Sequence, residues 1–108
     1  MAEPASALAT RPTRFLTDAD VGALADWRTV VQALASAYAL ALDAASVPPR
    51  SMARGEGIWL RCLSAVTPGG YMGCKLISAS PRAGRASYLV SLFDADTMEL
   101  AGLLDGNQ

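Results

Sequence analysis

Residues 57–66, GIWLRCLSAV, and residues 71–78, YMGCKLIS, decide how this chain folds. Both stretches have the pattern of β-strands, in which successive side chains point to opposite faces of a sheet. Pro68, Gly69 and Gly70 separate the two stretches and are residues typical of a tight turn. The sequence therefore predicts two consecutive strands that run antiparallel.

Both faces of the first strand are largely apolar. One face carries Ile58, Leu60, Cys62 and Val66, and the other carries Trp59, Arg61, Leu63 and Ala65. We therefore expect both faces of the sheet to be covered. Residues 86–93, ASYLVSLF, and residues 98–104, MELAGLL, predict a further hairpin that closes around Asp94 to Thr97.

Two helices are predicted ahead of the strands. Thr17, followed three residues later by Asp20, has the spacing of a capping box and predicts a short helix through Leu24. Asp26 is expected to cap a longer helix, which ends at Pro48–Pro49. The apolar residues of this second helix recur at helical spacing: Trp27, Val30, Val31, Leu34, Tyr38, Leu42 and Ala45.

The order of the elements, helices first and strands after them, predicts the fold class. We expect an α+β domain in which N-terminal helices pack on a mainly antiparallel sheet. A chain of 108 residues fits one domain of this kind. Residues 1–14 show no apolar periodicity and predict a flexible arm, so the domain is expected to span residues 15–108.

Composition excludes several classes of protein. With 52% apolar residues, 18% charged residues and a net charge of -1, the chain is expected to be packed and soluble, without a nucleic-acid partner. The first residues do not resemble a secretory signal, which predicts a cytoplasmic protein. The longest uncharged stretch, residues 29–42, is too short to span a bilayer, so no membrane segment is expected.

Familiar metal and phosphate motifs are not matched. Cys62 and Cys74 lack a CxxC spacing and the chain has no histidine, so we expect two buried free thiols and no metal site. The glycines before Cys74 precede a strand, whereas a phosphate-binding loop precedes a helix. In DADTMELAGLLD, residues 94–105, Glu99 replaces the glycine that a calcium loop requires. Arg82 and Arg85 are interpreted as solvated loop residues.

Lys75 is the single lysine of the chain and lies within a predicted strand. Two interpretations stay open from the residues alone: a surface lysine that reaches solvent over its apolar stem, or a lysine held for an anionic ligand. Arg50, directly after two prolines, favours the second interpretation, because a guanidinium and an ammonium together suit a carboxylate. We expect the two side chains to converge in one sheltered pocket.

The succession FLTDADV, VPPR, LSA, GCK, SLFDADT and LLDG, with a long amphipathic helix after the first motif, resembles the N-terminal domain of the ornithine cyclodeaminase/mu-crystallin family. The resemblance runs from Phe15 to the last residue. It implies the substrate-binding and dimerisation part of an NAD(P)-dependent enzyme that acts on a small amino or imino acid. It also implies that Arg50 and Lys75 bind the substrate carboxylate, that Lys75 has a catalytic role, and that a homodimer forms through the sheet.

Some features depart from the family pattern. Leu63, Ser64 and Ala65 stand where the family has Met-Pro-Ala, and Met98 stands where it has glycine. The chain has no G-x-G-x-x-G, and it stops before the family's Rossmann domain, which suggests a C-terminally truncated or split protein. We therefore expect no cofactor to bind this chain alone and the fragment to be inactive, unless a separate Rossmann-domain chain completes it.

Two alternatives to the enzyme fragment remain. One is a non-catalytic α+β module that forms a dimer for ligand binding or assembly. The other is an unrelated α+β domain in which Lys75 is a surface residue.

Overall fold

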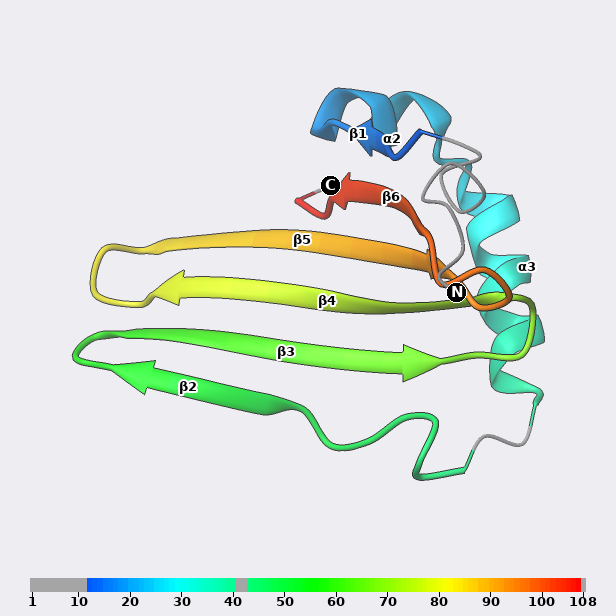
Figure 1. Cartoon of the computed structure of the whole chain (residues 1–108). Coiled ribbons are helices and arrows are strands. Elements are labelled where there is room, and N and C mark those ends of the chain that lie inside the picture. Colours follow the sequence, from blue (N-terminus) through cyan, green and yellow to red (C-terminus); the bar gives the residue numbers. More distant parts are fainter. Residues whose placement is uncertain (1–11, 41–42, 108) are drawn as a thin grey trace, which may run out of the picture.

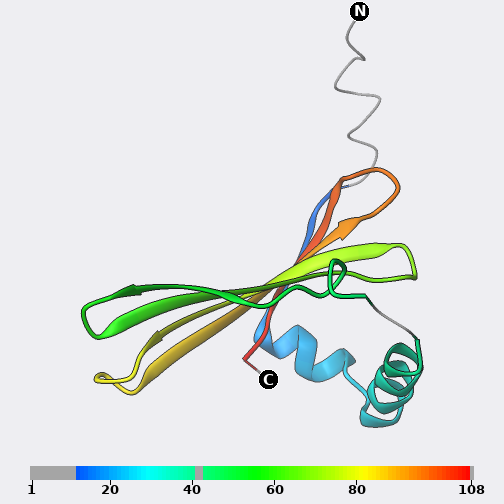
Figure 2. The same cartoon turned by 90° about the horizontal axis from the view of Figure 1, so that it is seen from below.

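The computed structural model describes residues 12–40 and 43–107 and has the predicted α+β fold. Figures 1 and 2 show a twisted sheet with both helices on the same side of it. In chain order the elements are β1 (Arg14–Leu16), α2 (Asp18–Leu24), α3 (Trp27–Tyr38), β2 (Ser51–Gly55), β3 (Ile58–Val66), β4 (Tyr71–Ser80), β5 (Arg85–Asp94) and β6 (Leu100–Asp105).

The six strands form one sheet in the order β1-β6-β5-β4-β3-β2. Strands β2 to β6 are joined as successive antiparallel neighbours, and β1 adds to the edge of β6 in parallel. The predicted hairpin of β3 and β4 is confirmed, with Gly69 and Gly70 in the turn at positive φ. The predicted hairpin of β5 and β6 is confirmed as well, and Asp94 Oδ1 accepts hydrogen bonds from the backbone N–H groups of Asp96 and Thr97.

The edge strands were not predicted from the sequence. β1 begins at Arg14, one residue ahead of the expected first structured residue, and Thr13 Oγ1 donates a hydrogen bond to the carbonyl of Leu100 at 3.0 Å. β2 has the sequence SMARG and pairs residue by residue with β3, from Ser51 opposite Cys62 to Gly55 opposite Ile58. β1 has three residues and β2 has five, so both are too short to show the apolar alternation that identifies a strand.

The predicted helix caps are confirmed. The backbone N–H of Asp20 donates to Thr17 Oγ1 at 3.1 Å, and the N–H of Thr17 donates to Asp20 Oδ2 at 3.0 Å, which completes the capping box. Asp26 caps α3 by accepting hydrogen bonds from the side chain and backbone of Thr29. These hydrogen bonds lower the pKa of Asp26 below its ordinary value of 3.8.

Helix α3 is shorter than the apolar periodicity predicted. It ends at Tyr38, and Ala45 lies in a turn, while Leu42 lies outside the described residues. The side chain and carbonyl of Asp43 both accept from the backbone N–H of Ser46, which favours a turn over a further helical turn. The helix thus ends well before Pro48–Pro49. Within the described residues, no helix is long and apolar enough to cross a bilayer.

Pairing across the strands defines two faces of the sheet. The Lys75 face carries Trp59, Arg61 and Leu63 of β3, Lys75 and Ile77 of β4, and Tyr88 and Val90 of β5. The Cys62 face carries Ile58, Leu60 and Cys62 of β3, Cys74 and Leu76 of β4, Ser91 of β5, and Phe15 of β1. Ile77, with 7% of its surface exposed, is the buried apolar side chain among the described residues.

The expectation that both faces are covered is wrong for this chain by itself. On the Cys62 face, Phe15, Ile58 and Leu60 are exposed. Helix α3 also lies apart from the sheet: among the described residues, no Cα atom of α3 comes within 8 Å of a strand. Its apolar side chains Trp27 and Tyr38 are 83% and 82% exposed. Large apolar surfaces are therefore left without a partner on the sheet and on the helix.

Candidate functional site

Lys75 lies in the middle of β4, opposite Leu63 on β3 and Val90 on β5. Its side chain is exposed, and its Nζ atom lies 5.5 Å from the centre of the Tyr88 ring. An ammonium over an aromatic face at an exposed position gains about 0.5–1 kcal/mol, so the ring helps to hold the charge on this face. The exposed side chain keeps its ammonium in contact with solvent.

Arg50 lies beside the same region of the sheet. The backbone N–H of Val66 donates to the carbonyl of Ser46 at 2.9 Å, so the chain already runs along β3 before β2 begins. Ser51, the first residue of β2, is opposite Cys62, and the residue after Cys62 is Leu63, the partner of Lys75. Arg50 therefore directly precedes the first pair between β2 and β3, and Lys75 lies one strand further on, opposite Leu63.

Both predicted site residues are solvent-exposed in the described chain. The expectation of a sheltered pocket around Arg50 and Lys75 is therefore wrong for this chain by itself. A hollow of about 270 Å³ does lie beside Lys75, between β3, β4 and β5, and its wall includes Leu63, Tyr71 and Val90. Arg50 does not line this hollow.

Gly73, in the Gly-Cys-Lys motif, sets the spacing of the strands next to Lys75. A β-carbon at position 73 would overlap the carbonyl oxygen of Ser91 on β5. Only a residue without a side chain permits this approach, because the obstacle is backbone and cannot rotate away. The glycine thus serves the packing of β4 on β5, immediately before the lysine.

Arg61 is a further cation on the Lys75 face, for which the sequence suggested no role. It is opposite Ile77, the residue two positions after Lys75, and its guanidinium carbon lies 4.5 Å from the centre of the Trp59 ring. Its Nε atom is buried and has no hydrogen-bond partner in the described part of the chain. The alternation of β3 groups Arg61 with Trp59 and Leu63, and the pairing of β3 with β4 places this group on the Lys75 face. The sequence alone does not show that the Arg61 Nε lacks a partner.

The charge on the Lys75 face is predominantly positive. Strands β2 to β5 place Arg54, Arg61 and Lys75 there, and the carboxylate that these strands add is Asp94, at the far end opposite Tyr71. An excess of cationic groups raises the local concentration of anions. This face is therefore chemically suited to bind a small anion.

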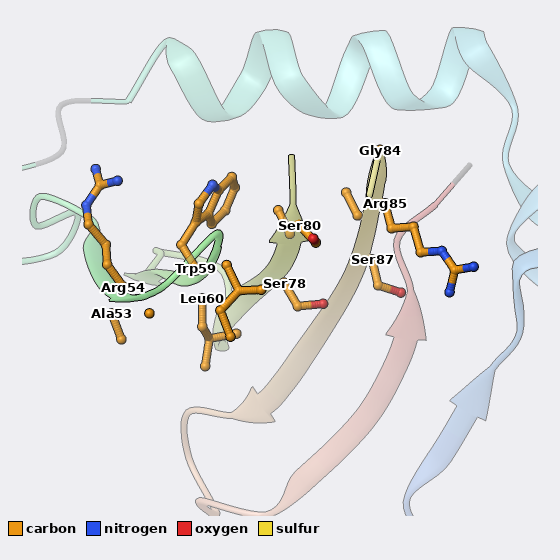
Figure 3. Close-up of a pocket in the computed structure, with 13 residues that line it drawn as sticks. Ala53, Arg54, Trp59, Leu60, Ser78, Ser80, Gly84, Arg85 and Ser87 are labelled. Atoms are coloured by element: carbon orange, nitrogen blue, oxygen red, sulfur yellow. The ribbon is translucent and has the colours of Figure 1, made fainter. Parts of the chain in front are cut away.

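A larger hollow lies elsewhere, at the other end of the long strands. It measures about 980 Å³ and is lined by Arg54, Trp59, Ser80 and Arg85 among others (Figure 3). In Figure 3, Trp59 points to the side of the sheet on which α3 lies, and Leu60 points away from it. Neither Arg50 nor Lys75 lines this hollow.

Comparison with solved structures identifies a protein that contains the same fold. A probable ornithine cyclodeaminase from Bordetella pertussis Tohama I matches with a TM-score of 0.75 and 22% sequence identity, over 89% of this chain and 31% of that chain. This chain thus spans about a third of that protein's length, and at this identity the likeness shows the fold alone. No protein-family model and no curated protein matches the chain.

Proposed function

We propose that this chain is the N-terminal, substrate-binding part of an ornithine cyclodeaminase-like, NAD(P)-dependent enzyme that acts on a small amino or imino acid. The observation that supports the proposal is the position of Arg50, 25 positions before Lys75 in sequence. It directly precedes the Ser51–Cys62 pair, and the residue after Cys62, Leu63, pairs with Lys75. The likeness of the fold to part of a probable ornithine cyclodeaminase supports it.

In this proposal Arg50 and Lys75 both bind the substrate carboxylate, and Lys75 alone also acts on the reacting centre. The Arg50 guanidinium offers a fixed fork of donors that matches the two oxygens of a carboxylate. The Lys75 ammonium is a point charge on a flexible stem, so it binds the same carboxylate and also reaches the nitrogen-bearing carbon beside it. There Lys75 donates a hydrogen bond that polarises the reacting centre, which is its catalytic role in the proposal.

The described residues do not fit a dinucleotide. A dinucleotide site uses a glycine-rich turn between a parallel strand and the N-terminus of a helix. Among the described strands the one parallel pair is β1 with β6. The connection from β1 to α2 is Thr17, directly followed by Asp18 of the helix, and contains no glycine. The hydride carrier that the proposal requires therefore has to bind a separate domain or chain.

The proposal includes a homodimer in which a second copy covers the Cys62 face. Ile58, Leu60 and Val66 of β3 are each about half exposed there, and water solvates these apolar side chains in the chain by itself. A stable homodimer buries about 800 Å² per partner or more, an area that a face of this sheet can offer. Light scattering coupled to size-exclusion chromatography tests it: dimer mass supports this part of the proposal, and monomer mass at about 100 µM removes it.

The exposed apolar face also favours a second candidate, a non-catalytic dimeric module. The two candidates differ in whether Arg50 and Lys75 bind a ligand. Titration of the chain with small 2-amino and 2-oxo acids, followed by NMR shifts of Lys75 and its strand neighbours, separates them. Saturable shifts that Lys75→Met abolishes support the substrate-binding role, whereas a dimer without any such shifts supports the module.

A further inference from the structure

Cys62 and Cys74 form a pair of thiols on the sheet face opposite Lys75. Their Sγ atoms lie 3.1 Å apart, and both side chains are half-buried rather than fully buried as expected from the sequence. Cys62 is opposite Leu76 and Cys74 is opposite Ser64, so the two cysteines are diagonal neighbours on adjacent strands. Two strands of the central hairpin thus hold the thiols together.

A direct disulfide fits this arrangement poorly. The sulfur atoms would have to approach by about 1 Å to reach a bond length of about 2.05 Å. Diagonal neighbours on antiparallel strands have Cα atoms about 7–8 Å apart, whereas disulfides usually join Cα atoms about 4.4–6.8 Å apart. The pair is therefore better placed to hold an atom between the two sulfurs than to bond directly.

The distance between the two sulfur atoms indicates which element could bridge them. Consider an atom bonded to both sulfurs at about 2.3 Å, the length of a zinc–thiolate bond. With the sulfurs 3.1 Å apart, the angle between its two bonds to sulfur would be about 85°. A tetrahedral zinc would need the sulfurs about 3.8 Å apart, and a linear Cu(I) would need about 4.6 Å. A trivalent arsenic carries a lone pair and holds its bonds close to right angles, so the observed separation is nearest to what arsenic requires.

The surroundings also disfavour zinc. The described residues contain no group of three or more histidine, cysteine, aspartate or glutamate side chains that could hold a metal ion. A structural zinc takes four protein ligands, and this site offers two. A monosubstituted arsenic(III) needs two sulfur ligands, because its third bond is to its own organic group.

We propose that Cys62 and Cys74 form a chelating dithiol site for monosubstituted trivalent arsenicals. In the reaction with an arsenoxide, each thiol loses its proton and two arsenic–sulfur bonds form. The arsenic–oxygen bond breaks, and the oxygen leaves as water with the two protons. Arsenic stays trivalent, so the step needs no oxidant or reductant. The site uses neither Arg50 nor Lys75. Because it lies on the Cys62 face, it requires that any second copy on that face leaves the two thiols accessible.

Titration of the reduced chain with phenylarsine oxide tests the proposal. Intact mass and a count of free thiols are expected to show one arsenical per chain and the simultaneous loss of both thiols. The adduct should persist in excess 2-mercaptoethanol and be released by 2,3-dimercaptopropanol, since only a dithiol competes with a chelate. Free thiols at equimolar reagent, or release by the monothiol, would overturn the proposal.

Variants and competing ions complete the test. Cys62→Ala and Cys74→Ala should each weaken arsenical binding on the order of 100-fold or more, because the second bond of a chelate forms at high effective concentration. Ser91→Ala, which keeps both thiols and removes a 3.4 Å hydrogen bond to the Cys74 carbonyl, should bind like the unmodified chain. Far-UV circular dichroism verifies the fold of each variant. Stronger protection of the two thiols by Zn²⁺ or Cu(I) than by the arsenical would contradict the geometric argument.

Discussion

Gly73 approaches Ser91 so closely that a β-carbon on the glycine would overlap the Ser91 carbonyl oxygen. Gly73→Ala should therefore lower the free energy of unfolding by about 1–3 kcal/mol, the usual cost of forcing extra volume into a packed site. Urea denaturation measures it. In the control Gly55→Ala, the new β-carbon meets only the Ile58 side chain, at 3.1 Å, which can move. Equal effects of the two substitutions would refute the special role of Gly73.

Met98 adopts φ 66° in the turn between β5 and β6, a left-handed conformation that favours glycine. Such a conformation costs an ordinary residue about 1–2 kcal/mol, and the added chain entropy of glycine offsets part of the gain. Because the side chain is 59% exposed, little packing is lost, and we expect Met98→Gly to stabilise the chain by about 0.5–1 kcal/mol. Thermal denaturation of Met98→Gly checks this, with Asp96→Gly as the control, because Asp96 lies outside the left-handed region. Asp96→Gly should destabilise.

Cys74 is expected to make stability depend on alkaline pH. Burial, a hydrogen bond with Cys62 and repulsion from Cys62 raise the pKa of Cys74 to about 11, from an ordinary 9.0. In the unfolded chain the thiol ionises near pH 9, while the folded chain keeps its proton. The contribution of Cys74 to the free energy of unfolding is therefore fully present below pH 9, and it is lost as the pH rises through 11. Urea denaturation from pH 8 to 11 should show a steeper decline for the unmodified chain than for Cys74→Ala, and parallel curves would argue against the shift.

The two helix caps should affect stability differently. Thr17→Ala removes the capping box of α2, which packs against β1 and β6, and should cost about 1 kcal/mol of unfolding free energy. Asp26→Ala removes the cap of α3, which no strand approaches within 8 Å in the described structure. It should reduce the helical circular dichroism signal and leave the urea midpoint of the sheet almost unchanged. A large shift of that midpoint would mean that α3 packs on the sheet in solution.

Much of the fold could be predicted because its signals are local. The capping box at Thr17 and the cap at Asp26 depend on residues three positions apart, and the long strands show their apolar alternation within single segments. Edge strand β2 could not be found this way, because it is identified by its pairing with β3 and not by its own composition. The early end of α3 was missed because the apolar period continues past it toward Asp43, whose side chain instead holds a turn.

The candidate site was predictable only in part. Alternation along β4 placed Lys75 on a face with Ile77, and pairing confirms that arrangement across β3 and β5. The solvent exposure of Arg50 and Lys75 could not be predicted from the sequence. It depends on what covers this face of the sheet and not on the apolar pattern of the strands. The stacking of Arg61 on Trp59 and the contact of the thiols of Cys62 and Cys74 depend on side-chain conformations and register, which no local pattern encodes.

The central claim is that Arg50 and Lys75 bind one carboxylate together. The most direct measurement is isothermal titration of the chain with a small 2-amino or 2-oxo acid that gives saturable NMR shifts. The affinity of the unmodified chain is then compared with those of Lys75→Met and Arg50→Met. Arg54→Met serves as the control, because Arg54 is another exposed arginine at this edge of the sheet. We expect the first two substitutions each to weaken binding about tenfold or more, equivalent to about 1.4 kcal/mol, and the control to leave it nearly unchanged. Binding that is equally insensitive to all three substitutions would contradict the claim.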